Sequence, residues 1–68
     1  MKTIKELDTV VLKRDLSGHR LERGDVGTVV HRYSTSEALE VEFITLEGET
    51  AGVLTLDAED VRYKKIDD

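Results

Sequence analysis

The sequence contains no cysteine and no proline. Without cysteine, no disulfide can brace the fold and no thiolate is available for metal or redox chemistry, so a reducing cytoplasm is the simplest compartment. Without proline, the connections between elements must rely on glycine and polar residues. Tryptophan is also absent, and the aromatic residues are Tyr33, Phe43 and Tyr63. We therefore do not expect a groove for proline-rich peptides, since such grooves are lined by aromatic side chains.

Long apolar runs are also missing. No stretch approaches the ~18 apolar residues of a membrane-spanning helix, and the lysines of MKTIKELDTV are not followed by the apolar segment of a signal peptide. We predict one cytoplasmic domain over residues 1–68, with a core over about 6–63, frayed termini and no membrane partner. Because a chain of this size buries only about 60% of its unfolded surface, we expect a stability of about 5 kcal/mol or less.

The hydrophobic residues, 38% of the chain, alternate with polar ones in a way that predicts β-strands. The alternation is clearest in Ala38–Thr45, where Glu40 and Glu42 lie on the face opposite the apolar residues. Further strands are predicted at 8–14, 25–33, 50–56 and 61–65. A helical spacing at 3–12 competes with the first strand, but the β-branched residues from Thr9 onward favour a strand. The predicted connections are a long first loop (15–24), turns at 34–37 and 46–49, and one helical turn at 57–60 capped by Asp57.

Five short strands are too few for two wide stacked sheets, so the predicted fold is all-β: a small, strongly bent five-stranded barrel that protects its edges. Such bending explains the two glycines of RGDVGTVV, Arg23–Val30. Gly24 is expected to close the first loop, and Gly27 to mark a bulge or a close approach between backbones. The predicted core comprises Val10, Leu12, Val26, Val29, Val41, Phe43, Leu54 and Val61, with Leu16 and Leu21 tucked under the first loop.

The segments DTVVL, GDVGTVV and LDAEDVR, in this order around an alternating strand, resemble SH3-like barrels of the KOW type over roughly Glu6 to Arg62. This resemblance implies a barrel with a long first loop and a single helical turn before the last strand. The longer segments ELDTVVLKRDL, GDVGTVVHRY, LEVEFITLEGET and VLTLDAEDVR are similar to a bacterial domain-of-unknown-function family of short single-domain proteins, common in cyanobacteria. Neither resemblance implies catalytic residues, and a fold of this kind hosts many functions.

No motif points to catalysis or to a cofactor. His19 and His31 are isolated, and Asp15, His19 and Glu22 in the first loop lack the spacing of a metal site. Neither a Gly-x-Ser-x-Gly elbow nor a Walker loop is present. A small barrel with an exposed acidic strand offers no water-excluding pocket for chemistry, so we predict a non-catalytic protein without metal or cofactor.

The charges are distributed unevenly. The formal net charge is −5; residues 1–34 hold seven Lys/Arg and five Asp/Glu, whereas residues 35–68 hold three and ten. Such an acidic segment is a solubilising surface in many proteins, but it also attracts basic partners. The leading hypothesis is a protein-interaction module for a basic protein, such as a neighbouring gene's product that this chain serves as antitoxin, immunity protein or accessory subunit. The predicted binding residues are Glu40, Glu42, Glu47 and Glu49.

Three alternatives follow from the same residues. A cluster of cations with a stacking tyrosine favours RNA or DNA binding, although the net charge opposes it; its residues are Lys13, Arg14, Arg20, Arg23, Arg32 and Tyr33. A groove at the first loop is a second possible site, for a peptide. An exposed strand edge would give a weak homo-oligomer instead of a monomer.

Overall fold

The computed structural model describes residues 3–44, 48, 50–65 and 67. It contains five strands: β1 (Thr9–Leu12), β2 (Val26–Arg32), β3 (Ala38–Ile44), β4 (Thr50–Asp57) and β5 (Val61–Tyr63). Two three-residue 3-10 helices complete it, η1 (Ser17–His19) in the first loop and η2 (Ala58–Asp60) before β5. The predicted all-β class, the five strands and the single turn before the last strand are confirmed. No helix in the described ranges is long and apolar enough to cross a membrane.

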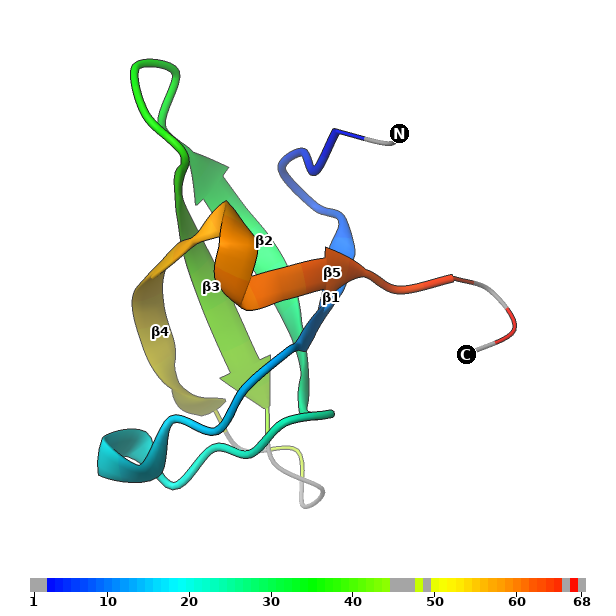
Figure 1. The fold of residues 1–68 in the computed structure, drawn as a ribbon, viewed down its shortest axis with the longest axis vertical. Helices are drawn as coiled ribbons and strands as arrows, with labels where there is room; N and C mark the ends of the chain where they lie inside the picture. Colours follow the sequence, from blue (N-terminus) through cyan, green and yellow to red (C-terminus); the bar gives the residue numbers. More distant parts are fainter. Residues whose placement is uncertain (1–2, 45–47, 49, 66, 68) are drawn as a thin grey trace.

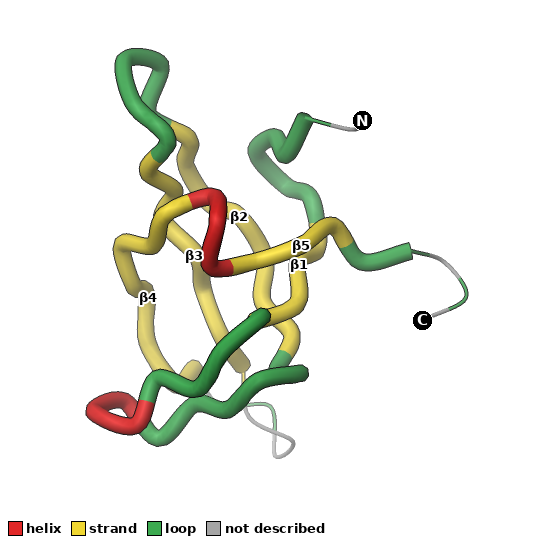
Figure 2. Tube along the Cα trace, viewed as in Figure 1, coloured by secondary structure: helices red, strands yellow, loops and turns green. Residues whose placement is uncertain are grey.

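The strands form one antiparallel sheet in the order β4-β3-β2-β1-β5. Figure 1 shows β2, β3 and β4 as a meander, with β1 and β5 crossing the other side of the molecule. The turn between β2 and β3 and the first loop with η1 project from opposite ends (Figures 1 and 2). Within the described residues no β4–β5 pairing closes the sheet, so the closed barrel and its SH3-like type stay predictions.

The core lies on the concave side of this sheet and confirms most of the predicted residues. The largest fully buried side chain is Phe43, and the other buried core members are Val10, Leu12, Leu16, Leu21, Val29, Leu39, Val41, Leu56 and Val61. Leu54 packs against these residues but is only half-buried, because it lies on an edge strand. Leu16 and Leu21 are drawn in by a pair of backbone hydrogen bonds of 2.8 and 3.3 Å between them.

The prediction for Val26 is wrong, because its side chain is 42% exposed. Val26 pairs with Val11 across β1, and the neighbouring Gly27 occupies the inward position opposite Val10. Strand alternation then turns Val26 outward. Val11, which the sequence pattern also left out of the core, is only 6% exposed on this outward side.

The two glycines of RGDVGTVV have different roles. Gly24 adopts a φ of +98°, which suits glycine and confirms its place at the end of the first loop. Gly27 marks a close approach, since a Cβ there would lie 2.7 Å from Val41 Cγ1 and 2.9 Å from the carbonyl oxygen of Glu42. The register shift of β2 lies farther along, between Val29 and His31, so the bulge is not at Gly27.

The turn η2 is fixed by a capping box. Asp57 Oδ1 accepts a hydrogen bond from the Glu59 N–H at 3.3 Å, and Asp60 Oδ2 accepts one from the Asp57 N–H at 3.1 Å. The opposite oxygen, Asp60 Oδ1, binds Arg14 Nε at 2.7 Å. These contacts confirm Asp57 as the cap and hold η2 against the start of the first loop.

Candidate functional site

The acidic face, which we define as the outward side of β3 with Glu40 and Glu42, contains two different carboxylates. Both oxygens of Glu40 accept hydrogen bonds inside the protein, from the Tyr33 hydroxyl at 2.6 Å and from the Thr55 hydroxyl at 2.7 Å. His31 lies opposite Glu40 in the sheet, and its ring contacts Tyr33 edge-on with centroids 4.7 Å apart. Glu40 therefore has a mainly structural role, since a basic partner would have to compete with both hydroxyls for its carboxylate.

Glu42 is the more available of the two. It lies between Thr28 on β2 and Val53 on β4, and no described residue pairs with its carboxylate. Exposed apolar side chains flank it, with Ile44 55% and Val53 51% exposed. The remaining predicted acids, Glu47 and Glu49, lie outside the described residues, as does most of the predicted 46–49 turn.

The Tyr33–Glu40 contact makes stability depend on pH at both ends of the scale. The hydrogen bond raises the pKa of Tyr33 above 10.0, and the donors Tyr33 and Thr55 lower the pKa of Glu40 below 4.5. The neutral phenol stabilises the fold below pH ~10 and loses this effect as pH rises through its folded pKa. The Glu40 carboxylate stabilises it above pH ~4.5 and loses this effect as pH falls through its lowered pKa.

Tyr33→Phe is therefore expected to weaken the alkaline loss of stability and to move the pKa of Glu40 back toward 4.5. Carbon-detected NMR titration of the Glu40 carboxyl and thermal unfolding across the pH range measure the two effects. Thr55→Val is the matched control, because it removes the other donor and should raise the Glu40 pKa without changing the alkaline limb. An unchanged Glu40 pKa in Tyr33→Phe would contradict the assigned contact.

The structure does not bring the predicted nucleic-acid residues together as one free cationic surface. Arg14 is engaged by Asp60, an ion pair that lowers the pKa of the aspartate. Arg32 Nη1 donates to the Ile4 carbonyl oxygen at 3.0 Å, and the Tyr33 hydroxyl donates to Glu40. Arg20 and Arg23 are exposed in the first loop, and Lys13 is exposed at its start. Three of the six residues thus already have hydrogen-bond partners within the protein, and nucleic-acid binding stays a prediction.

The bulge in β2 determines the direction of the side chains in the last part of this strand. On one side of the bulge Val29 pairs with Val41, and beyond it His31 pairs with Glu40 and Arg32 with Leu39. The extra residue, Val30, reverses the alternation. It therefore turns His31 outward to the acidic face and Arg32 inward to the open end of the core.

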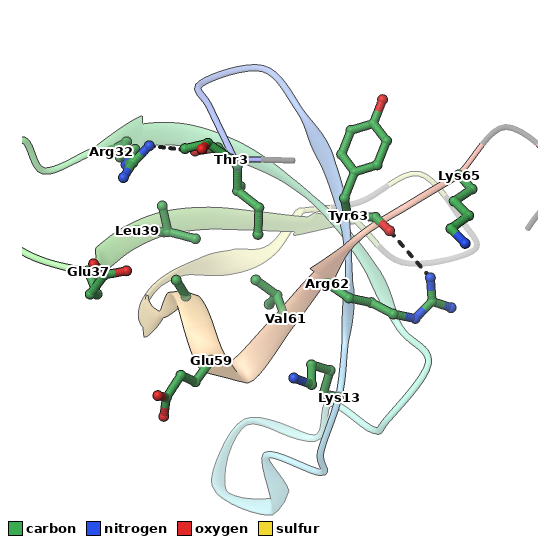
Figure 3. Close-up of a pocket in the computed structure, with 12 residues that line it drawn as sticks. Thr3, Lys13, Arg32, Glu37, Leu39, Glu59, Val61, Arg62, Tyr63 and Lys65 are labelled. Atoms are coloured by element: carbon green, nitrogen blue, oxygen red, sulfur yellow. Dashed lines mark hydrogen bonds between the residues drawn. The ribbon is translucent and has the colours of Figure 1, made fainter. Parts of the chain in front are cut away.

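Arg32 helps to line a groove of about 950 Å³ between the N-terminal segment and the η2–β5 unit. Figure 3 shows its residues arranged around η2 and β5, with Thr3 and Arg32 on one wall and Lys13 on the other. Half-buried Ile4, Ala58 and Tyr63 supply apolar surface above the buried Leu39 and Val61. This groove, hereafter the η2–β5 groove, brings together two predicted residues, Lys13 and Arg32, with residues that the pattern did not single out.

The charges of the η2–β5 groove are separated along its length. Glu37 and Glu59 lie at one end, where Arg32 is also found, whereas Arg62 and Lys65 lie at the other (Figure 3). The Ala58 N–H donates to the Glu37 carbonyl oxygen at 2.9 Å, which joins the start of β3 to η2. No sequence signal links these residues, since the contact is between segments about twenty positions apart.

The described residues contain no group of three or more His, Cys, Asp or Glu that could hold a metal ion. Neither a curated protein nor a solved structure matches the chain significantly. One family model does match, over residues 6–63, and its description is "Domain of unknown function (DUF4926)". The fold and this match agree with the family resemblance that the sequence segments suggest. The chain belongs to the family of the domain of unknown function DUF4926.

Proposed function

We propose that this domain is a non-catalytic protein-interaction module that binds a basic protein partner through the acidic face. The observation that carries the proposal is the position of Glu42, a carboxylate without a partner among the described residues, beside the exposed side chains of Ile44 and Val53. Grouped apolar exposure of this kind marks interaction surfaces more often than plain solvent surface. A partner with a lysine or arginine set among apolar side chains would match both features.

The charge of the whole chain supports the same partner class. A net charge of −5 attracts a basic protein at long range and raises its rate of association. The absence of cysteine favours a cytoplasmic setting for the complex. The product of a neighbouring gene is the first partner to test, with this chain as its antitoxin, immunity protein or accessory subunit.

The test uses two charge reversals with the same effect on net charge. Glu42→Lys alters the acidic face, whereas Glu22→Lys alters an exposed first-loop residue whose carboxylate has no described partner. The basic product of the neighbouring gene is mixed with each purified variant and the Kd is measured by calorimetry. We expect Glu42→Lys to weaken binding by about tenfold or more, because a repulsive contact replaces an attractive one at the interface.

Glu22→Lys should stay within about twofold of the unchanged chain, as expected for a charge outside the interface. Equal weakening by both variants would show that only the overall charge matters and would contradict the acidic face as the binding surface. Absence of any complex between the unchanged chain and that partner would contradict the proposed function itself.

A further inference from the structure

We infer that the η2–β5 groove is a second docking site, which takes an extended protein segment with an apolar side chain next to a lysine or arginine. The inference rests on the proposed function for the class of its ligand, a protein, and concerns a different surface, because neither Glu40 nor Glu42 lines the groove. The apolar side chain would lie over Ala58 and Ile4, and the cation would lie between Glu37 and Glu59.

The shape of the groove suits a chain segment. Its volume of about 950 Å³ is at the upper end of ligand-sized cavities, and the groove is open to solvent. Ile4, Ala58 and Tyr63 leave part of their apolar surface uncovered above a buried floor of Leu39 and Val61. An extended peptide can bury one side chain on such a surface while its flanking residues reach the charged rims.

The acidic end of the groove determines the charge that the ligand would carry there. Glu37 and Glu59 are both exposed, neither carboxylate has a partner among the described residues, and the Ala58–Glu37 hydrogen bond holds their segments together. A lysine or arginine that reaches between these two carboxylates is attracted to both. The groove therefore favours a positive group at this end.

The opposite end of the groove is basic and would contact the part of the ligand that follows its apolar side chain. Arg62 and Lys65 line this end and Lys13 lines one wall, so cationic side chains predominate here. A segment whose acidic residue or terminal carboxylate follows the apolar one fits this polarity, which gives binding a direction. Nucleic acid fits less well, because its phosphates repeat a single sign and would meet Glu37 and Glu59.

The walls of the groove are fixed before any ligand arrives. Arg32 ties the N-terminal wall by donating to the Ile4 carbonyl oxygen at 3.0 Å. The Leu7 N–H donates to the Val29 carbonyl oxygen at 2.7 Å, and the Val29 N–H donates to the Asp8 carbonyl oxygen at 2.9 Å. On the other side the capping box and the Arg14–Asp60 pair hold η2. A preformed site loses less conformational entropy on binding, which favours even a short segment.

The experiment selects ligands from displayed random peptides of about ten residues, a length typical of groove-binding segments. Peptides enriched on the full chain are synthesised with a fluorescent label, and the Kd is measured by anisotropy. We expect enriched peptides to share a lysine or arginine close to an aliphatic residue. Binding should weaken about tenfold or more in the double variant Glu37→Lys/Glu59→Lys, since both contacts become repulsive.

The matched control is Glu22→Lys/Asp67→Lys, which changes net charge equally at two exposed acids that lie neither in the groove nor on the acidic face; it should bind within about twofold of the unchanged chain. No enrichment, enriched peptides without a cation, or equal loss in both double variants would overturn the inference. So would tight binding of a labelled single-stranded RNA at about 50 mM salt that disappears at higher salt. If peptides bind as expected while Glu42→Lys leaves the protein partner bound, the acidic face fails and the groove stands.

Discussion

Replacing Gly27 with alanine is expected to destabilise the domain by about 2 kcal/mol or more, the usual cost of forcing an extra carbon into a packed region. The added Cβ would lie 2.7 Å from Val41 Cγ1, 2.9 Å from the Glu42 carbonyl oxygen and 2.9 Å from Phe43 Cδ1. Two of these atoms belong to fully buried core side chains and the third to the backbone of β3. None of them can move away without disturbing the β2–β3 pairing.

One effect opposes the clash, because alanine reduces the freedom of the unfolded chain and thereby stabilises the fold by about 0.4–1 kcal/mol. We expect the clash to exceed this gain. In a domain of this size the melting temperature should fall by roughly 10 °C, at about 4–8 °C for each kcal/mol. Thermal unfolding followed by circular dichroism, with urea titration as a second measure, gives the result.

Two other glycines separate the clash from the backbone effect. A Cβ on Gly18 meets nothing within 4 Å, so Gly18→Ala should be nearly neutral. Gly24 also has open space, but its φ of +98° disfavours alanine, so Gly24→Ala should cost about 1 kcal/mol from backbone strain alone. If Gly27→Ala proves as mild as Gly18→Ala, the close approach of β2 and β3 is not as described.

Truncating Phe43 to alanine is expected to produce the largest single loss, about 3–5 kcal/mol. Phe43 is the largest fully buried side chain and is 1% exposed. It pairs with Gly27 on one side and with Gly52 on the other, so neither residue directly opposite it has a side chain that could fill the cavity. This loss approaches the whole stability expected for a domain of this size, about 5 kcal/mol or less.

Because Phe43→Ala is expected to leave little folded protein, Phe43→Leu provides a milder measurement. It should destabilise the fold by about 1–2 kcal/mol, as moderate core truncations do. Urea unfolding measures the free energy of unfolding of both variants, and an unchanged m-value makes the comparison direct. Ile44→Ala is the matched control, since Ile44 is 55% exposed on the same strand. A loss in Phe43→Leu no larger than in Ile44→Ala would contradict the central place of Phe43.

The effects of the substitutions at Gly27 and Phe43 on stability should also be coupled. Phe43 Cδ1 occupies part of the space that a Cβ at position 27 would need, so Phe43→Leu is expected to relieve part of the strain in Gly27→Ala. The double variant should be more stable than the sum of the single changes predicts by about 0.5 kcal/mol or more, as is usual for residues in contact. Strict additivity would mean that the clash with the Glu42 carbonyl oxygen dominates.

Local signals in the sequence located the elements well. The alternation of Leu39, Val41 and Phe43 with Glu40 and Glu42 predicts β3 and its two faces, because a strand places successive side chains on opposite sides. Asp57 followed by Ala-Glu-Asp predicts the capped turn, because the cap needs only residues within one turn. The family resemblance depended on the same contiguous segments.

The candidate sites needed information that is not local. Glu37 and Glu59 are far apart in the sequence, and only the packing of η2 against the start of β3 brings their segments together. Likewise, the bonds of Tyr33 and Thr55 to Glu40 cross from one strand to another. Charge counting grouped Glu40 with Glu42, whereas the structure gives them different environments.

By itself the sequence determined the all-β class, the positions of the five strands, the need for glycine at positions 24 and 27, and the uneven distribution of charge. These features depend on side-chain periodicity and on conformational preferences that act over a few residues. The tertiary structure alone decided that the bulge at Val30 turns Arg32 into the η2–β5 groove and turns His31 toward Glu40. One inserted residue reverses every side chain beyond it, and strand pairing, not local preference, determines where that insertion lies.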